Sequence, residues 1–348
     1  MIPVYDRVHP LRKPKGFEPV VQRWSVGFPN KCQAMCVSFY GVQGPERDTV
    51  YRSQFFDWLR RTQDLSSAPT VVDHAAFSDA NGLYTHIAAL YWIDTEQRDG
   101  WTANPHVGDW WNSAARLDEG VGYFKESLTI PLERQETLYW QDYPAGLSRS
   151  PEVAVYPTPY CGYYGAMRDR LPLAAVDPLL SELAALPARS RVYGQGARWR
   201  VSTPNNLAVI RSAAFWGRCD PGQTEDYLRD LRAPLEHGMA YLRDNPTDTG
   251  CCTLRFQQTC DAAGAPFLET HALGYFLSLD HLENWAERHP SHDAIFSAAI
   301  ARYRKYGSAN QLRTWHEVFV LPKEGQVMEY INCAAGTGLL GYFDTVKL

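Results

Sequence analysis

The sequence predicts an α+β protein made of two ferredoxin-like halves within one chain. Each half gives the same order of predicted elements, strand–helix–strand–strand–helix–strand, which is the order of a ferredoxin-like unit. A Glu-x4-Pro pattern and a later tyrosine also recur 191 positions further along the chain (317 − 126 and 330 − 139). With 348 residues, 45% of them hydrophobic, the chain has ample apolar material for a core of this kind.

The repeated positions are occupied by aromatic residues, glutamates and prolines. They are Tyr91, Trp101, Pro105, Glu126, Pro131 and Tyr139 in the first half, matched by Tyr275, Trp285, Pro290, Glu317, Pro322 and Tyr330 in the second. The repeat also marks where the halves differ, because Lys125 stands at the place of His316, and His106 or Val107 near that of His292. Such positions are candidates for chemistry, although a chance agreement of aromatic positions is the alternative interpretation.

Composition excludes several classes of function. The net charge of −5 gives no basic surface for nucleic acid or anionic lipid. Residues 1–17 contain no apolar segment typical of a signal peptide, and no run of about 18 apolar residues occurs, so we expect a cytoplasmic protein with reduced cysteines. The 11 Trp, 20 Tyr and 14 Phe indicate either a core rich in aromatic residues or a core around a large flat ligand.

The first half is predicted over residues 31–171, after an extended arm at 1–30 that is rich in Pro, Lys and Arg. Apolar residues at helical spacing and alternating runs define its elements. These are a strand at 36–43, a helix at 49–63, strands at 70–74 and 84–92, a helix at 95–115 interrupted at Pro105, and strands at 120–131 and 135–140.

The second half is predicted over residues 201–348, after a linker at 172–200. Its elements are a strand at 207–215, a helix at 224–245, strands at 252–260 and 271–278, a helix at 292–306 ending at Gly307, and strands at 312–321 and 326–331. Thr224 is the expected N-cap of the long helix, and Pro234 should kink or divide it.

Two histidines lie beside a proline at the start of the helix near residue 290. Pro290 fits the first helical position, and the residue before a proline is pushed out of helical geometry, so His289 is expected outside the helix. His292 then falls in the first turn, on one face with Ile295 and Phe296. A histidine on such a face can let a flat macrocycle lie close to the helix, or it can simply be a capping or surface histidine.

A second candidate site lies on two predicted strands. His316 alternates with Glu317, so the two side chains point to opposite faces, and a histidine on an apolar face can act as a general acid or base. Ser212 shares a face with Ile210, while Arg211 points the other way. The alternatives are a core histidine with one hydrogen bond and a serine tolerated in the core.

Several short motifs, in order from about residue 40 to 345, together resemble one family. They are GVGYFKE at 120–126, ETLY at 136–139, YYGAMRDRLP at 163–172, NLAVIRS at 206–212, YLRDN at 241–245, WAERHPSH at 285–292, HEV at 316–318 and EYINC at 329–333. In these motifs the sequence is similar to the haem-containing aldoxime dehydratases, lyases that convert R–CH=N–OH to a nitrile and water. The resemblance implies a haem-binding fold of the dimeric α+β barrel type.

The resemblance also implies roles for five residues. His292 would be the axial ligand of the iron of haem b, which is ferrous in the active state, and His316 the distal general acid and base. Ser212 would bind the substrate hydroxyl, while Arg170 and Glu136 would complete the distal network. The substrate would be an aldoxime, and the enzyme a homodimer with neither nucleic acid nor membrane as a partner.

Some alternatives stay open at this level. Arg168 could replace Arg170 as the distal arginine, and the segment between His292 and His316 is longer than the resemblance leads us to expect. A haem peroxidase, a chlorite dismutase-like enzyme or a non-catalytic haem-binding protein could share this fold and cofactor. The R group of the aldoxime, arylalkyl or aliphatic, is not determined.

Overall fold

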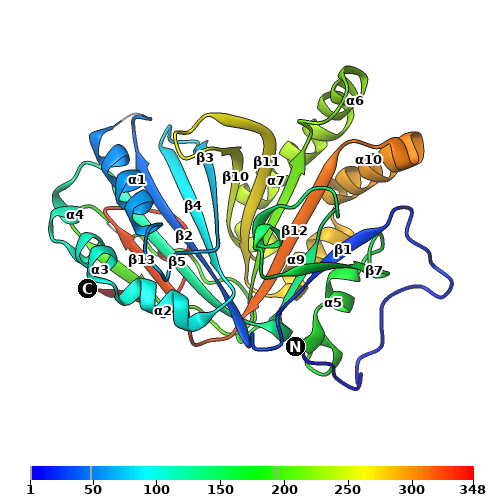
Figure 1. Cartoon of the computed structure of the whole chain (residues 1–348), viewed down its shortest axis with the longest axis horizontal. Coiled ribbons are helices and arrows are strands. Elements are labelled where there is room, and N and C mark those ends of the chain that lie inside the picture. Colours follow the sequence, from blue (N-terminus) through cyan, green and yellow to red (C-terminus); the bar gives the residue numbers. More distant parts are fainter. Residues whose placement is uncertain (1, 48, 193) are drawn as a thin grey trace.

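The computed structural model describes residues 2–47, 49–192 and 194–348, and most of its strands belong to one curved antiparallel sheet (Figure 1). In the order of pairing, its twelve strands in the described residues are β14 (Thr345–Lys347), β8 (Arg198–Val201), β13 (Val327–Ile331), β5 (Gly122–Pro131), β2 (Ala34–Gly44), β4 (Tyr84–Trp92), β3 (Val71–Ser78), β10 (Cys251–Cys260), β11 (Pro266–Phe276), β9 (Leu207–Phe215), β12 (Arg313–Leu321) and β6 (Gln135–Leu138).

The strand order repeats on the two sides of the β3–β10 pair. Outward from this pair, the first half gives β3-β4-β2-β5 and the second gives β10-β11-β9-β12. Each half then gains a strand from the other, because β13 pairs with β5 and β6 pairs with β12. The predicted units 31–171 and 201–348 therefore share one sheet rather than forming two separate ones.

The helices lie in two groups, one on each flank of the sheet, as Figure 1 shows. The first group is α1 (Val50–Thr62), α2 (Thr95–Ala103), α3 (Pro105–Asn112) and α4 (Ala115–Asp118); the second is α6 (Pro221–Asp226), α7 (Ala233–Asp244), α8 (Pro246–Thr249), α9 (Leu279–Arg288) and α10 (Pro290–Tyr306), with α5 (Ala166–Arg170) nearby. Helices α3 and α10 both begin with a proline after a side-chain cap, Asn104 and His289 respectively. No helix among the described residues is long and apolar enough to cross a membrane.

The long helix of the second half begins earlier than predicted. Thr224 is not its N-cap: Asp220 is, because its carboxylate accepts a hydrogen bond from the Gln223 N–H at 2.8 Å and Pro221 suits the first helical position. Pro234 does not break the helix. A π-helical segment, Tyr227–Arg232, joins α6 to α7 just before the proline and absorbs the irregularity.

Several elements were not predicted from the sequence. The expected extended arm contains β1 (Arg23–Gly27), which pairs with β7 (Ala154–Thr158) in a small separate sheet. The expected linker ends in β8, and helix α9 was not predicted at all. Strands as short as β1 and β8 carry too few residues for a clear alternation, so their partners rather than their own sequence define them.

The space between sheet and helices is filled differently in the two halves. Under α1–α3 it holds a dense cluster of aromatic residues, in which the rings of Trp58 and Trp110 stack with centroids 4.3 Å apart. For the first half, the interpretation of aromatic residues as plain core is therefore correct. In the second half the same layer is made mainly of aliphatic residues and contains a cavity.

Candidate functional site

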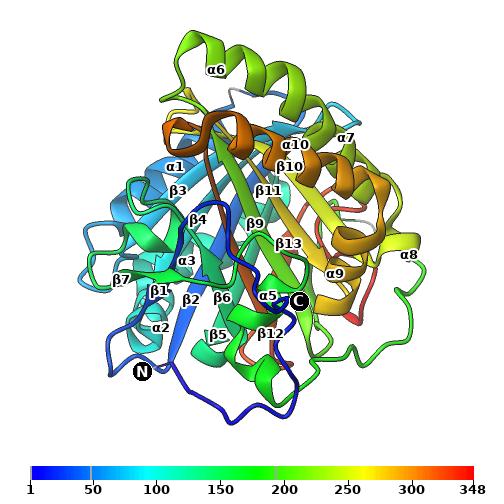
Figure 2. The same ribbon diagram turned by 90° about the vertical axis from the view of Figure 1, so that its right-hand side faces the viewer.

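The cavity lies between the sheet and the helices of the second half. Figure 2 looks onto this flank, where α7 lies over β10 and α9 over β9 and β11. The cavity encloses about 230 Å³ and its walls are mainly apolar, with side chains that include Met167, Ile210, Leu235, Met239, Phe276 and Phe296. His292, His316, Ser212 and Arg170 also line it. Apolar walls with a few convergent polar groups are the usual character of a ligand site.

His292 enters the cavity from the first turn of α10. The Trp285 ring packs edge-on against it, with centroids 4.8 Å apart, and Tyr164 approaches it from the loop before α5. Burial lowers the pKa of His292 although the Ala286 carbonyl opposes the shift, so the ring is neutral at pH 7. Its Nδ1 is buried and has no hydrogen-bond partner of normal geometry among the described residues.

His289, the neighbouring candidate, is committed to the helix cap. Its Nδ1 accepts a hydrogen bond from the Ser291 N–H at 3.2 Å and lies 2.7 Å from the Ser291 hydroxyl. The Tyr241 ring stacks on it at 3.9 Å. The two histidines are therefore separated as the position of Pro290 predicts: His289 caps α10, and His292 is free to meet a ligand.

On the opposite wall, His316 on β12 forms a cluster with Arg170 at the end of α5 and Glu136 on β6. Arg170 Nη2 is 2.9 Å from His316 Nε2, and Arg170 Nε donates to Glu136 Oε2 at 2.6 Å. Glu136 Oε1 is 3.0 Å from the same His316 nitrogen, but out of line for a hydrogen bond. Arg170 can thus donate to Nε2 when the ring is neutral, and the nearby Glu136 carboxylate favours the charge of the ring when it is protonated.

The charges of this cluster follow from burial and from Arg170. Burial opposes ionisation of Glu136, but Arg170, followed by His316, outweighs it and lowers the pKa of Glu136 to about 2. Burial lowers the pKa of His316, against the pull of Glu136. The Arg170 guanidinium is the largest influence that favours the ionised form of Glu136. The resting cluster is therefore Arg⁺, Glu⁻ and a neutral histidine.

Ser212 lies directly beside His316 in the sheet. The two residues are register partners in the β9–β12 pair, and Leu138 of β6 is the partner of His316 on its other side. Residues directly opposite in an antiparallel pair have their side chains on the same face, roughly 5 Å apart. The Ser212 hydroxyl is open to the cavity and makes no hydrogen bond with the residues that the structure describes.

The two candidate arginines on α5 point to different partners. Arg168 binds Glu283 and Asp280 of α9 at 2.9 and 2.6 Å, away from His316. Asp169, between the arginines, accepts hydrogen bonds from the backbone N–H groups of Arg12 and Lys13. The structure therefore brings Arg170 to His316, and the N-terminal arm holds the segment that carries it.

Two aromatic residues beside His292, Trp285 and Tyr164, were not among the predicted site residues. Both belong to motifs on which the resemblance rests, WAERHPSH and YYGAMRDRLP. Their spacing alone gave no sign that they converge, because Tyr164 and His292 are 128 residues apart in the chain (292 − 164). The signal that could have found them is their position within the motifs rather than any local periodicity.

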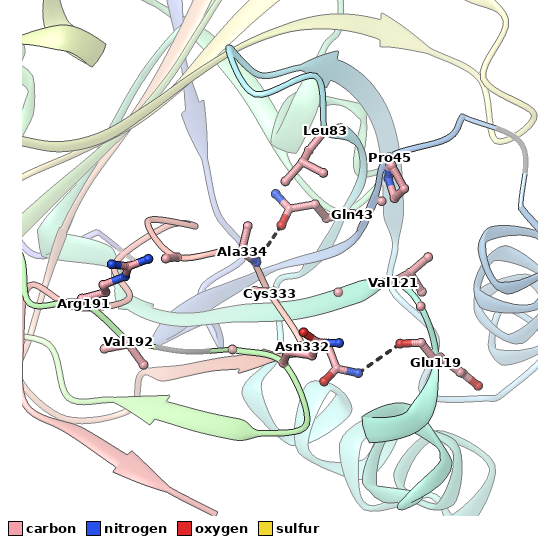
Figure 3. A pocket seen from close by; sticks show the side chains of 16 residues that line it. Gln43, Pro45, Leu83, Glu119, Val121, Arg191, Val192, Asn332, Cys333 and Ala334 are labelled. Atoms are coloured by element: carbon pink, nitrogen blue, oxygen red, sulfur yellow. Dashed lines mark hydrogen bonds between the residues drawn. The ribbon is translucent and has the colours of Figure 1, made fainter.

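Several other hollows are larger, and two of them show that they offer less for chemistry on a small molecule. One, of about 350 Å³, lies beside β2 and β5 and is shown in Figure 3. Two of its polar side chains are already paired: Gln43 accepts from the Ala334 N–H, and Asn332 donates to the Glu119 carbonyl. The other, of about 690 Å³, lies on the inner face of the sheet beside Glu269. Neither combines apolar walls with a histidine held by an arginine and a glutamate. The side chains that line a hollow therefore identify the candidate site better than its volume does.

Comparison with known proteins gives one consistent result. The family model described as haem-containing dehydratase matches residues 38–339. The phenylacetaldoxime dehydratase of Bacillus sp. (strain OxB-1) is 32% identical over 96% of this chain and 95% of its own. The aliphatic aldoxime dehydratase of Pseudomonas chlororaphis is 32% identical over 94% and 93%.

Solved structures agree with these relatives. A crystal structure of an aldoxime dehydratase superposes with a TM-score of 0.87 at 30% identity, covering 98% of this chain and 97% of the other. A second aldoxime dehydratase, crystallised with butyraldoxime, gives 0.88 at 29% identity, covering 98% and 94%.

Proposed function

This chain belongs to the family of haem-containing dehydratases, and we propose that it converts aldoximes, R–CH=N–OH, to nitriles and water. The observation that carries the proposal is the convergence of His316, Arg170 and Ser212 on one apolar cavity opposite a neutral His292, with Glu136 bound to Arg170 behind them. A carrier of haem needs a ligand for the iron, but it does not need an acid–base histidine beside a hydroxyl on the other wall. Dehydration needs both.

Haem is the cofactor of the family, and the residues present fit it. We infer that His292 would bind the iron, since its neutral ring lines the cavity and its Nδ1 has no hydrogen-bond partner of normal geometry among the described residues. The cavity is smaller than the roughly 300–1,000 Å³ of typical ligand pockets, so its walls must part to admit a macrocycle. Met167 and Met239 are unbranched and can do this at low cost. When bound, ferrous haem b supplies an open coordination position that activates the oxime nitrogen.

His316 would carry the proton chemistry. Because the resting ring is neutral, it first takes up a proton from solvent. As imidazolium it then protonates the departing hydroxyl, the N–O bond breaks, and water leaves. The neutral ring then takes the proton bound to carbon as the nitrile forms, which restores the imidazolium. One proton is given and one is taken, so the reaction balances as R–CH=N–OH giving R–C≡N and H2O. Ser212, open to the cavity beside His316, would bind the hydroxyl and hold it towards the histidine.

Arg170 and Glu136 would support both states of His316. Glu136 favours the protonated ring, and Arg170 favours the neutral one by donating to Nε2. A histidine between an arginine and a carboxylate can change its charge without large movement of its neighbours, which suits a group that must be an acid and then a base.

We also infer from the repeated strand order that the chain is a duplicated ferredoxin-like unit of the dimeric α+β barrel type. The matched orders β3-β4-β2-β5 and β10-β11-β9-β12 support this inference. The same proposal includes an N-terminal arm at 1–30, a linker at 172–200 and a homodimeric state. Sedimentation or light scattering of the purified protein would test the last of these.

The direct test is nitrile formation. The haem-loaded protein, reduced without oxygen, should convert phenylacetaldoxime, butyraldoxime or both to the nitrile, detected by gas chromatography, with a change in the haem spectrum on mixing. Both substrates are needed, because relatives named for arylalkyl and for aliphatic aldoximes are equally similar to this chain. Oxidation of a dye by peroxide, with no nitrile from any aldoxime, would instead support the peroxidase alternative.

The cluster around His316 predicts opposite pH shifts in two variants. Glu136 raises the pKa of His316 and Arg170 lowers it, so the pH midpoint of kcat should fall in E136Q and rise in R170Q relative to the wild type. The measurement is the kcat–pH profile of each variant. Shifts in the same direction would mean that the profile reports a group other than His316.

A further inference from the structure

Behind the proposed site, on the inner face of the sheet, Glu317 is fully buried among four groups that donate hydrogen bonds or carry charge. The hydroxyls of Tyr91 and Tyr139 each donate to it at 2.6 Å, and the Leu147 N–H donates at 2.8 Å. The Arg211 guanidinium lies 3.7 Å away and also contacts the Tyr91 hydroxyl. We refer to Glu317, Arg211, Tyr91 and Tyr139 as the Glu317 cluster.

Three of the four members of this cluster are chain neighbours of residues that line the cavity. Glu317 follows His316, Arg211 precedes Ser212, and Tyr139 follows Leu138. Because successive side chains of a strand point to opposite faces, the cluster lies back to back with the proposed catalytic residues through the sheet. The strand register agrees, since His316 pairs with Ser212, and Glu317 pairs with Arg211.

The chain contains a matched cluster that has no site behind it. Glu126 is 191 residues before Glu317 and is also fully buried (317 − 126). It binds both terminal nitrogens of Arg255, at 2.6 and 2.7 Å, and the hydroxyls of Tyr275 and Tyr330, at 2.9 and 2.8 Å. On the other face of its strand, Lys125 pairs with Glu329 at 3.0 Å in the layer filled by aromatic residues.

We propose that the Glu317 cluster is a positioning element for the dehydration reaction, which holds β6, β9 and β12 in the register that sets His316 beside Ser212 and Glu136. The inference rests on the proposed function. Strands β9 and β12 each contribute one residue to the cluster and one to the site, Arg211 and Ser212 from β9 and Glu317 and His316 from β12. Strand β6 contributes Glu136 to the site, and Tyr139 of the cluster directly follows this strand. The Glu126 cluster serves the stability of the fold alone.

The physical reason is that the carboxylate ties these strands at one point. Four groups converge on Glu317, and a glutamine there would place an amide N–H against Arg211, which can only donate, and would leave the Tyr91 hydroxyl without its acceptor. Strands β9 and β12, which carry Arg211 and Glu317, would have to shift relative to each other to relieve this contact. Catalytic groups displaced by about 1 Å lose on the order of 10²-fold in rate, so a small shift of β9 against β12 is enough to matter.

The experiment compares E317Q with E126Q, both loaded with haem. Each variant removes one charge from a buried cluster of one glutamate, one arginine and two tyrosines, so both should melt at lower temperature than the wild type. Well below either melting temperature, E317Q should lower kcat by about 10- to 100-fold with little change in KM, and should move the pH midpoint of kcat. E126Q should keep kcat within about 3-fold of the wild-type value and the pH midpoint of kcat within about 0.2 units of it, which is ordinary measurement scatter.

A milder pair covers the case in which either variant fails to fold. Y139F and Y330F each remove one hydroxyl, at positions that also differ by 191, from Glu317 and Glu126 respectively. Y139F should lower kcat and Y330F should not. Equal loss of kcat within either pair, or an E317Q protein with the kcat and pH midpoint of the wild type, would overturn the positioning role.

This result is separable from the proposed function. If the wild type makes no nitrile, the proposed function fails. The protonation midpoint of His316 can still be measured from the pH dependence of the haem spectrum. The part of that dependence due to His316 is identified by its loss in H316A. A midpoint displaced in E317Q but not in E126Q supports the positioning role, and an unchanged midpoint in both refutes it.

Discussion

A His292→Ala variant is expected to lose most of its bound haem. The reason is that His292 is the histidine of α10 with a neutral ring in the cavity, whereas its neighbour His289 is committed to the helix cap. Without the imidazole, only apolar contacts with the cavity walls would hold the macrocycle. The measurement is the ratio of haem to protein after purification, by the absorbance of the pyridine adduct.

The matched control for this prediction is His289→Ala. It removes the cap of α10, which costs about 1 kcal/mol of stability, but it leaves the cavity wall in place. This variant should therefore retain haem. Haem content and spectrum like the wild type in H292A, together with loss in H289A, would transfer the iron ligand to the other histidine.

A His316→Ala variant is expected to keep its haem and to form nitrile about 10²- to 10⁴-fold more slowly. General acid–base catalysis contributes a factor of this size, and His316 is the histidine that lies beside Ser212 on the sheet wall of the cavity. Single-turnover measurements of nitrile after mixing with an aldoxime would separate this step from binding and product release.

The first half offers a control for His316 as well. Lys125 stands 191 residues before it on the matching strand (316 − 125) and is paired with Glu329. Lys125→Ala tests the general cost of removing a partly buried polar side chain from that position, and it should leave the rate nearly unchanged. Undiminished turnover in H316A would mean that another group moves the protons.

The prediction of the fold from the sequence succeeded where elements are long and periodic. The strand at 207–215 has the predicted bounds, and Pro105 and Pro290 both start helices, because proline fixes a backbone angle wherever it stands. The prediction failed for β1 and β8, and for the cap at Thr224. These depend on pairing partners or on a competing side chain, Asp220, and such competition is decided by three-dimensional contacts.

For the site, the sequence by itself determined the alternation of faces. Chain neighbours on a strand must point to opposite sides, so the alternation alone places His316 opposite Glu317, and Ser212 opposite Arg211, across the sheet. The motifs further suggested which histidine, arginine and glutamate belong together. The rule that proline displaces the preceding residue from helical geometry distinguished His289 from His292.

Only the tertiary structure decided which of these side chains meet and which copy of the repeat holds the cavity. Arg170 reaches His316, whereas Arg168 turns to Glu283, although both arginines lie on one short helix. The layer under the helices is filled by Trp58 and its aromatic neighbours in the first half and left open in the second. The physical reason is that local patterns fix the direction of a side chain relative to its own strand or helix, while packing between distant segments fixes what it contacts.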